Sequence, residues 1–153
     1  MVRLSDLSPA LADALRKLPM PEFAATPLAQ PPSLSQSRVA IVSTAGLHRR
    51  SDATFRPGAS DFRIIPGDVA TSELVMSHVS VNFDRSGFAQ DPNLVFPIDR
   101  LREMKASGEI GSLAAWHYSF MGASDPSTMS ESGAEVGRLL KRDGVDIALL
   151  VPV

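Results

Sequence analysis

The sequence contains no cysteine, which excludes disulfide bonds, thiolate metal sites and thiol catalysis within its 153 residues. It also lacks a large excess of charge: the formal net charge is −2, so no electropositive surface for nucleic acid or an anionic membrane is expected. No apolar run approaches the roughly 20 residues that span a bilayer, and charged residues interrupt the first positions, where a signal peptide has its apolar core. We therefore expect a cytoplasmic protein whose partners are small molecules or other proteins, with neither nucleic acid nor membrane among them.

The residues that are present are typical of one globular domain. With 44% hydrophobic and 21% charged residues, the composition is ordinary and the chain is long enough to bury a core. Ser8 and Pro9 can begin a short helix, and prolines are then frequent over positions 19–32. We expect an N-terminal docking helix and proline-rich arm over 1–37, followed by an α/β domain over 38–153.

Apolar strands and helices alternate within this domain. The segments 38–44 (RVAIVST) and 145–153 (VDIALLVPV) are nearly continuous in apolar residues, as in strands that are buried on both faces. Helices are expected after Pro97 and after Asp125, and Gly144 would end the second one. This order predicts a layered α/β fold with a mainly parallel sheet flanked by helices. No helix follows the last strand, so we expect C-terminal elements of the fold to be missing.

Polar residues follow the predicted strands at the sheet edge where α/β proteins bind ligands. Ser43, Thr44 and Gly46 come at the end of the first strand, where hydroxyl and backbone N–H groups can donate to an anionic substrate group. Asp84 and Arg85 follow an alternating, strand-like run and precede Ser-Gly, which predicts a turn. Arg85 would hold a substrate carboxylate with two hydrogen bonds, or the Asp-Arg pair would only stabilise the turn.

The three histidines, His48, His78 and His117, each lie within or beside a predicted strand or its following loop. Histidine transfers protons near neutral pH, so we assign a catalytic role to these residues together with Asp84; the alternative is three hydrogen-bonded structural histidines. The ends of the first and last strands should lie side by side, with His48 and His117 facing one crevice. No HExxH or His-x-His spacing indicates a metal site, and no GxGxxG or GxxxxGK[ST] motif indicates a nucleotide fold.

Several separated blocks of sequence carry a family resemblance. They are RVAIVSTAGLH at 38–48, FRIIPGDV at 62–69, SHVSVNFDRSG at 77–87, NLVFPIDRL at 93–101 and IGSLAAWHYSFMGA at 110–123. In this order the blocks resemble the selenoprotein B subunits of the glycine, betaine, sarcosine and D-proline reductase family. The resemblance covers roughly residues 26–153 and is more specific than any single short motif.

The resemblance implies the N-terminal part of a reductase subunit that cleaves a C–N bond of glycine, betaine, sarcosine or D-proline. In that family a pyruvoyl-bearing partner subunit holds the amine, and a selenolate or thiolate of the selenoprotein B subunit attacks the substrate carbon. Because this chain has no cysteine, the resemblance implies a selenocysteine or cysteine beyond Val153. The chain would then end where a selenocysteine codon was taken as a stop, and it would be inactive alone.

Two other functions stay open on the residues themselves. One is a non-catalytic module for small-ligand binding or assembly, and the other is a hydrolase or lyase that uses the histidines with Asp84. We also expect a homo-oligomer, because the last apolar strand has no following helix to cover it and exposed strand edges are usually buried by another subunit.

Overall fold

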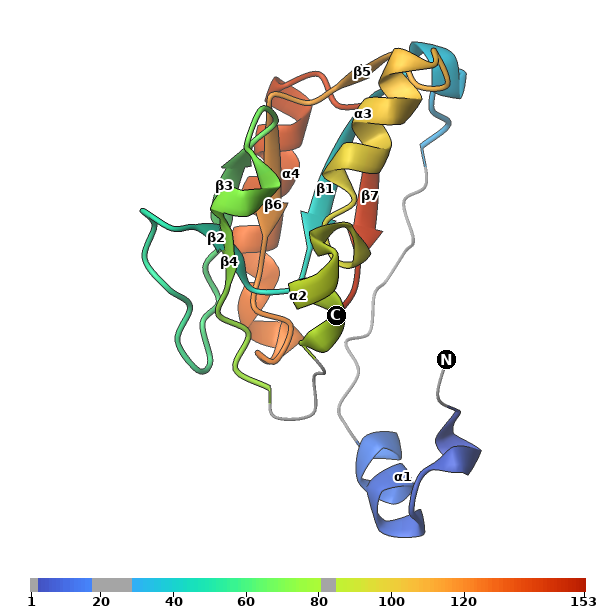
Figure 1. The fold of residues 1–153 in the computed structure, drawn as a ribbon. Helices are drawn as coiled ribbons and strands as arrows, with labels where there is room; N and C mark the ends of the chain where they lie inside the picture. The colour runs from blue at the N-terminus through green and yellow to red at the C-terminus, as the bar shows by residue number, and fades with distance from the viewer. Residues whose placement is uncertain (1–2, 18–28, 81–84) are drawn as a thin grey trace.

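The computed structural model describes residues 3–17, 29–80 and 85–153, which form a layered α/β domain preceded by a short helix (Figure 1). The helices are α1 (Pro9–Arg16), α2 (Ser86–Gln90), α3 (Ile98–Ala106) and α4 (Ser130–Arg142). The strands are β1 (Arg38–Ser43), β2 (Leu47–Arg49), β3 (Arg63–Pro66), β4 (Leu74–Met76), β5 (Ser112–Leu113), β6 (Trp116–Ser119) and β7 (Ile147–Val151). Short 3-10 helices lie at Leu4–Asp6, Leu34–Gln36, Thr71–Glu73, Pro92–Leu94 and Pro126–Met129. Asp84, a predicted site residue, lies outside the described residues.

The main sheet is built around β1. On one side β1 pairs in parallel with β5 at its start and with β6 at its end, and on the other side it pairs in parallel with β7. β3 extends the β6 side as an antiparallel strand, and β2 and β4 form a separate antiparallel pair. The predicted α/β fold with a mainly parallel sheet is therefore confirmed, as is the prediction that the first and last strands lie side by side.

β1 is central because both of its faces are apolar. Val39 and Ile41 belong to the buried cluster that includes Ile98 and Leu101 of α3. Val42, which points to the opposite face, packs in a second cluster with residues of α4. Burial of each such side chain contributes roughly 1.5–3 kcal/mol. The sheet is thus covered by α3 on one face and by α4 on the other (Figure 1).

Capping residues set the helix ends where the sequence predicts them. Ser8 Oγ accepts a hydrogen bond from the Leu11 N–H at the start of α1. Gly108 and Gly144 follow α3 and α4 with φ values of 78° and 67°, the left-handed conformation that commonly ends a helix. Asp125 accepts from the Ser127 N–H at 2.9 Å, but this cap begins a 3-10 turn, and α4 itself starts at Ser130.

The last strand is not buried as predicted. β7 lies at the edge of the sheet, paired with β1 alone in the part of the chain that the structure describes. Its Leu150 side chain is 68% exposed and Leu149 is 37% exposed. The reason is that α3 and α4 pack mainly over β1 and β6, so Ile147 and Val151 are only partly covered by the α3 cluster and Leu149 and Leu150 are left exposed.

Other local predictions also need correction. Residues 77–80 form no strand, because the regular pairing with β2 ends at Met76 of β4. Ser86 and Gly87, predicted as a turn, begin the short helix α2. Gly133 and Gly137 do not mark a close approach of α4 to the sheet, because a Cβ added at either position would meet nothing within 4 Å.

The N-terminal helix exposes part of its apolar side. Leu11 and Leu15 of α1 are 44% and 40% exposed, so its leucine stripe is not covered by a packed partner. Across the described residues, no helix combines the length and the apolar character needed to cross a membrane.

Candidate functional site

The carboxyl ends of β1, β6 and β7 are tied together by hydrogen bonds. The Thr44 N–H donates to the Val151 carbonyl at 3.1 Å, and the Thr44 hydroxyl accepts from the Val153 N–H at 2.8 Å. After β6, the Gly122 N–H donates to the Thr44 carbonyl at 2.8 Å. A Cβ at Gly122 would overlap the Val153 carbonyl oxygen and lie 2.8 Å from that of Thr44, so a larger residue does not fit.

Gly46 brings the segment after β4 to the same edge of the sheet. Its N–H donates to the Phe120 carbonyl at 2.8 Å, and its own carbonyl accepts from the Ser77 N–H at 3.0 Å. Its φ of 64° is in the left-handed region, and an added Cβ would lie 3.0 Å from the His78 backbone nitrogen. Both the backbone conformation and the limited space require glycine at position 46, where the chain passes close to the backbone of His78.

Arg85 is fixed against this segment through one of its guanidinium nitrogens. Nη2 donates to the His78 carbonyl and, at 3.0 Å, to the Ser80 carbonyl. The side chain is exposed, and its Nε and Nη1 groups have no hydrogen-bond partner among the described residues. Within the described residues, the guanidinium is therefore oriented by the backbone, and Nε and Nη1 carry N–H groups that can meet an anionic ligand.

His78 is neutral at physiological pH. It is 5% exposed, and burial, together with the charge of Arg85, holds its pKa below the usual value for histidine. Its Nδ1 accepts from the Ser80 N–H at 3.3 Å, which places the imidazole proton on Nε2. The Nε2 atom is itself buried, so it is the backbone of His78, and not its ring, that lies against Gly46 at the sheet edge.

His117 is located inside the sheet. Its side chain is 0% exposed, and its Nδ1 accepts from the Ile41 N–H at 2.9 Å. Burial, followed in importance by the charge of Arg102, lowers the pKa of His117 to about 4, and Asp143 acts in the opposite direction. The ring packs edge to face against Phe96 with 5.7 Å between the ring centroids, which gives His117 a structural role in the sheet.

His48 is also buried. Its side chain is 2% exposed on β2, and Nδ1 lies 2.7 Å from the Arg49 carbonyl oxygen. With exposures of 2% and 0%, His48 and His117 do not face an open crevice, contrary to the prediction. Alternation along a strand explains this, because every second side chain points into the core.

The structure therefore brings together only part of the predicted set. Thr44, Gly46, His78 and Arg85 gather at the carboxyl ends of the strands, linked by the contacts described above. Ser43 points inward instead: it is 0% exposed, and its hydroxyl donates to the Val95 carbonyl at 2.8 Å. The catalytic assignments of His48, His78, His117 and Asp84 stay predictions.

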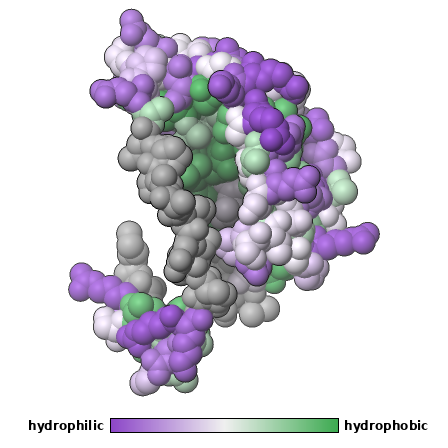
Figure 2. Space-filling model, turned by 180° about the vertical axis from the view of Figure 1, so that it is seen from behind, coloured by the Kyte–Doolittle hydropathy of each residue, from purple (hydrophilic) through white to green (hydrophobic). Residues whose placement is uncertain are grey.

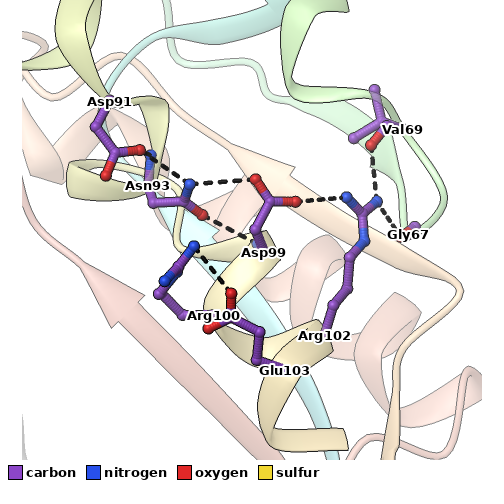
Figure 3. A network of polar contacts seen from close by, with 8 residues as sticks. All are labelled: Gly67, Val69, Asp91, Asn93, Asp99, Arg100, Arg102 and Glu103. Atoms are coloured by element: carbon purple, nitrogen blue, oxygen red, sulfur yellow. Dashed lines mark hydrogen bonds and ion pairs between the residues drawn. The ribbon is translucent and has the colours of Figure 1, made fainter. Parts of the chain in front are cut away.

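A second polar cluster, which sequence reasoning missed, is centred on Arg102 (Figure 3). Arg102 donates to Asp99 at 2.8 Å and to the carbonyls of Gly67 and Val69 at 2.9 and 2.7 Å, thereby joining α3 to the loop after β3. The i, i+3 spacing of Asp99 and Arg102 was the available sequence signal. Arg102, with Asp68, Lys105 and Trp116 among the other wall residues, lines an open cavity of about 670 Å³.

Potential metal ligands do not gather in the described part of the chain. There, no group of three or more histidine, aspartate or glutamate side chains is arranged to hold a metal ion.

Comparison with known proteins connects this architecture to a family. The family model for glycine/sarcosine/betaine reductase selenoprotein B matches residues 14–152. The chain belongs to this family. The match extends across the sheet, both covering helices and the cluster around Gly46, so the family assignment applies to the whole α/β domain.

Curated members of the selenoprotein B family show the same relationship. The chain is 38% identical over 120 residues to D-proline reductase subunit gamma of Acetoanaerobium sticklandii, covering 76% of this chain and 49% of that protein. It is 30% identical over 138 residues to sarcosine reductase complex component B subunit beta of Peptoclostridium acidaminophilum, covering 86% and 32%. It is 31% identical over 143 residues to glycine reductase complex component B subunit gamma of Carboxydothermus hydrogenoformans, covering 88% and 32%. The chain thus spans half or less of the length of these relatives, and no solved structure matches it.

The residues of this chain do not fit the nucleophile that a selenoprotein implies. The 153 residues include no cysteine, so no side chain here can form a thiolate. What the described residues can offer a substrate is hydrogen bonding and charge.

Proposed function

We propose that this chain binds and orients a small amino-acid-like or betaine-like substrate for a reductase that cleaves a C–N bond. The observation that carries the proposal is the family match over residues 14–152. It is supported by relatives named as D-proline, sarcosine, betaine and glycine reductase subunits. These four compounds share a carboxylate close to an amine or ammonium group, so one recognition mode for the carboxylate would serve all of them.

In this proposal Arg85 binds the substrate carboxylate. Its Nη2 is held by the carbonyls of His78 and Ser80, so the orientation of the guanidinium is set before a ligand arrives. Both two-pronged edges of a guanidinium include Nη2, so Nε and Nη1 would each donate a separate charge-assisted hydrogen bond to the carboxylate. Gly46 and the backbone of His78 are adjacent to this anchor and contribute shape.

The attacking group and the group that holds the amine come from outside these residues in the proposal. The family resemblance assigns them to a selenocysteine or cysteine encoded beyond codon 153 and to the pyruvoyl group of a partner subunit. The nucleotide sequence tests the first assignment: TGA followed by an open frame with a cysteine, a helix and further strands would support it. TAA, TAG or a frame that closes at once would contradict it and favour a non-catalytic binding module. Cytoplasmic location also stays a prediction.

Thermal unfolding with and without ligand tests the role of Arg85. D-Proline, sarcosine, betaine and glycine are each added to the wild-type chain, with ATP as the nucleotide control. A ligand at about 100 times its Kd stabilises the folded state by roughly 2.7 kcal/mol. That stabilisation raises the Tm by several degrees, on the order of 2–4 °C per kcal/mol at this chain length. We expect one or more of the four compounds to raise the Tm, and ATP not to.

Matched variants assign the effect to one residue. Arg85→Ala should abolish the Tm increase, and Arg85→Lys should keep only part of it because an ammonium keeps the charge but lacks the planar donor geometry of the guanidinium. Arg100→Ala is the control, since Arg100 is a 60% exposed arginine paired with Glu103 on the surface of α3. Equal ligand protection in wild type and Arg85→Ala would remove Arg85 from the proposal.

A further inference from the structure

β7 presents an unprotected strand edge. In the described part of the chain it pairs with β1 alone, and its side chains are apolar from Ile147 to Val151. Leu150 is 68% exposed on the face that α4 covers elsewhere, and Leu149 is 37% exposed on the face of α3. Figure 2 shows apolar surface left open between hydrophilic margins on the face opposite to that seen in Figure 1. Such a surface is a template for another strand.

The register with β1 shows which backbone groups are free. The Thr44 N–H donates to the Val151 carbonyl, so Val151 is one of the residues whose backbone faces β1. Residues of a strand alternate in the side to which their N–H and C=O point. The backbone groups of Ala148 and Leu150 therefore point away from β1, and Pro152, at the next outward position, has no N–H to offer.

The opposite edge of the sheet is protected in a way that β7 is not. β3 begins with a charged residue, Arg63, and ends with Pro66, and both features discourage pairing with another strand. Within Ile147–Val151 there is neither charge nor proline, and every residue is regular strand. The two edges of one sheet thus differ, and only β7 has the character of an interface.

We propose that β7 pairs in antiparallel fashion with β7 of a second copy of this chain, about a two-fold axis at Leu149. The outward-facing positions Ala148 and Leu150 are symmetric about Leu149, so Ala148 of each copy meets Leu150 of the other and each pair exchanges both hydrogen bonds. A small side chain then lies opposite a large one on the α4 face. Leu149 meets its own copy on the α3 face, and no charged residue of β7 opposes another.

This self-complementarity is what favours a second copy over an unrelated partner. In a two-fold contact the same surface of both molecules must be self-complementary. β7 meets this condition in a register where Ala148 and Leu150 both form hydrogen bonds to the second copy. The pairing does not depend on the reductase assignment, because it uses no residue of the cluster around Gly46 and Arg85.

Disulfide trapping tests the register, since the chain has no cysteine of its own. In a non-hydrogen-bonded antiparallel pair the Cα atoms are about 4.5 Å apart, which is within the range that a disulfide spans. Leu149→Cys should therefore form a covalent dimer under mild oxidation. Leu94→Cys is the control: Leu94 is a 64% exposed leucine in the 3-10 helix before α3, and its variant should stay monomeric.

Light scattering on the uncrosslinked chain tests the association itself. The wild type should be a dimer at micromolar concentration, and Leu150→Lys should weaken dimerisation by roughly ten-fold or more, because each of two symmetric sites then buries an ammonium group. The lysine is tolerated in the monomer, since Leu150 is already 68% exposed, and an unchanged far-UV spectrum checks this.

Three results would overturn the proposal. They are a wild-type monomer at every concentration, a Leu150→Lys variant that dimerises as strongly as wild type, and a Leu149→Cys variant that crosslinks no faster than Leu94→Cys. Any of these would leave the edge of β7 to a strand from a different polypeptide.

Discussion

The imidazole of His117 fills the gap between β5 and β6, where β1 has no strand partner on that side. β1 pairs with β5 at Val39 and with β6 from Val42, and between these points the Ile41 N–H donates to His117 Nδ1 instead. An unpaired backbone N–H in the core costs roughly 1–3 kcal/mol, so the ring stabilises the break between β5 and β6. Only a neutral imidazole can do this, because Nδ1 must accept.

The free energy of unfolding should therefore decrease as the pH is lowered through the range set by His117. Its pKa is lowered from 6.5 to about 4 in the folded chain, so between these values the unfolded chain binds a proton that the folded chain does not. Stability from this group is complete above pH 6.5 and is lost as pH falls towards 4, by on the order of 3 kcal/mol. Urea unfolding at pH values across this range measures the slope.

The variant His117→Gln tests whether His117 is the source of this pH dependence. Gln cannot titrate, so the variant should be less stable than wild type at pH 7 and lose most of the pH dependence. His78, whose pKa is also lowered by burial and by Arg85, leaves a smaller slope of the same sign. Wild-type stability that stays constant from pH 7 to 4.5 would show that His117 is not held neutral by the fold.

Replacement of glycine by alanine should have opposite effects on stability at Gly122 and at Gly133. Gly122→Ala should destabilise the chain by roughly 1–3 kcal/mol, because its Cβ would overlap the Val153 carbonyl and press on that of Thr44. Gly133→Ala should stabilise it by about 1 kcal/mol, because an added Cβ in α4 meets nothing within 4 Å and alanine favours the helix. Thermal or urea unfolding measures both. Equal effects would mean that the ends of β1, β6 and β7 are not packed as described.

At the scale of elements, one carboxylate joins three of them. Asp143, directly after α4, accepts from Arg38 of β1 at 2.7 Å and from the N–H groups of Ala115 and Trp116 at 2.7 and 3.3 Å. Its side chain is only 12% exposed, although the bonds from Ala115 and Trp116 lie at the surface. The end of α4, the start of β1 and the start of β6 are held in register by this group.

Asp143→Ala should therefore cost roughly 2–4 kcal/mol, since it leaves a guanidinium and two backbone donors without their acceptor. Glu135→Ala is the matched control. Glu135 pairs with Arg138 on the open surface of α4, where the two side chains are 44% and 66% exposed, and such pairs are worth about 1 kcal/mol or less. Urea unfolding of both variants gives the comparison, and similar losses would contradict the structural role of Asp143.

The elements that sequence predicts well are those whose signals are local. β1, α3 and α4 are marked by a continuous apolar run, by Pro97 with Gly108, and by Asp125 with Gly144. β2, β4 and β5 are two or three residues long, too short for periodicity to show. The exposure of β7 was not predictable either, because an apolar strand is buried or bare depending on what packs against it.

The candidate site was predictable to the same limited extent. The left-handed turn at Gly46 and the strand-end position of Thr44 follow from local sequence. Which face of a strand a histidine takes depends on register, and a shift of one residue exchanges core and surface. That dependence placed His48 and His117 inside, and it left Arg85, held by the carbonyls of His78 and Ser80, as the accessible charged group of the cluster.

At the scale of the whole molecule, fold and chemistry are separable. The described residues form one hydrophobic cluster on the α3 face of the sheet and one on the α4 face, in a chain that spans 49% of D-proline reductase subunit gamma and 32% of the sarcosine and glycine reductase relatives. A buried core of this kind predicts a cooperative folding unit. Under the proposed function, ligand binding uses the Gly46 and Arg85 cluster, whereas turnover needs a selenolate or thiolate that no residue here can provide.

The purified chain should therefore bind a substrate of this class and show no reductase turnover. Binding is read from the increase in Tm, and turnover from C–N cleavage products by mass spectrometry with a dithiol as reductant. D-Proline reductase of Acetoanaerobium sticklandii serves as the positive control for the product assay. Removing a nucleophile from an enzyme leaves binding and orientation but not the covalent step, so a Tm increase without product is the expected pair of results. Product formed by this chain alone would show that its own side chains carry the chemistry, and the histidines beside Gly46 and Ile41 would then have to be reconsidered as catalytic groups.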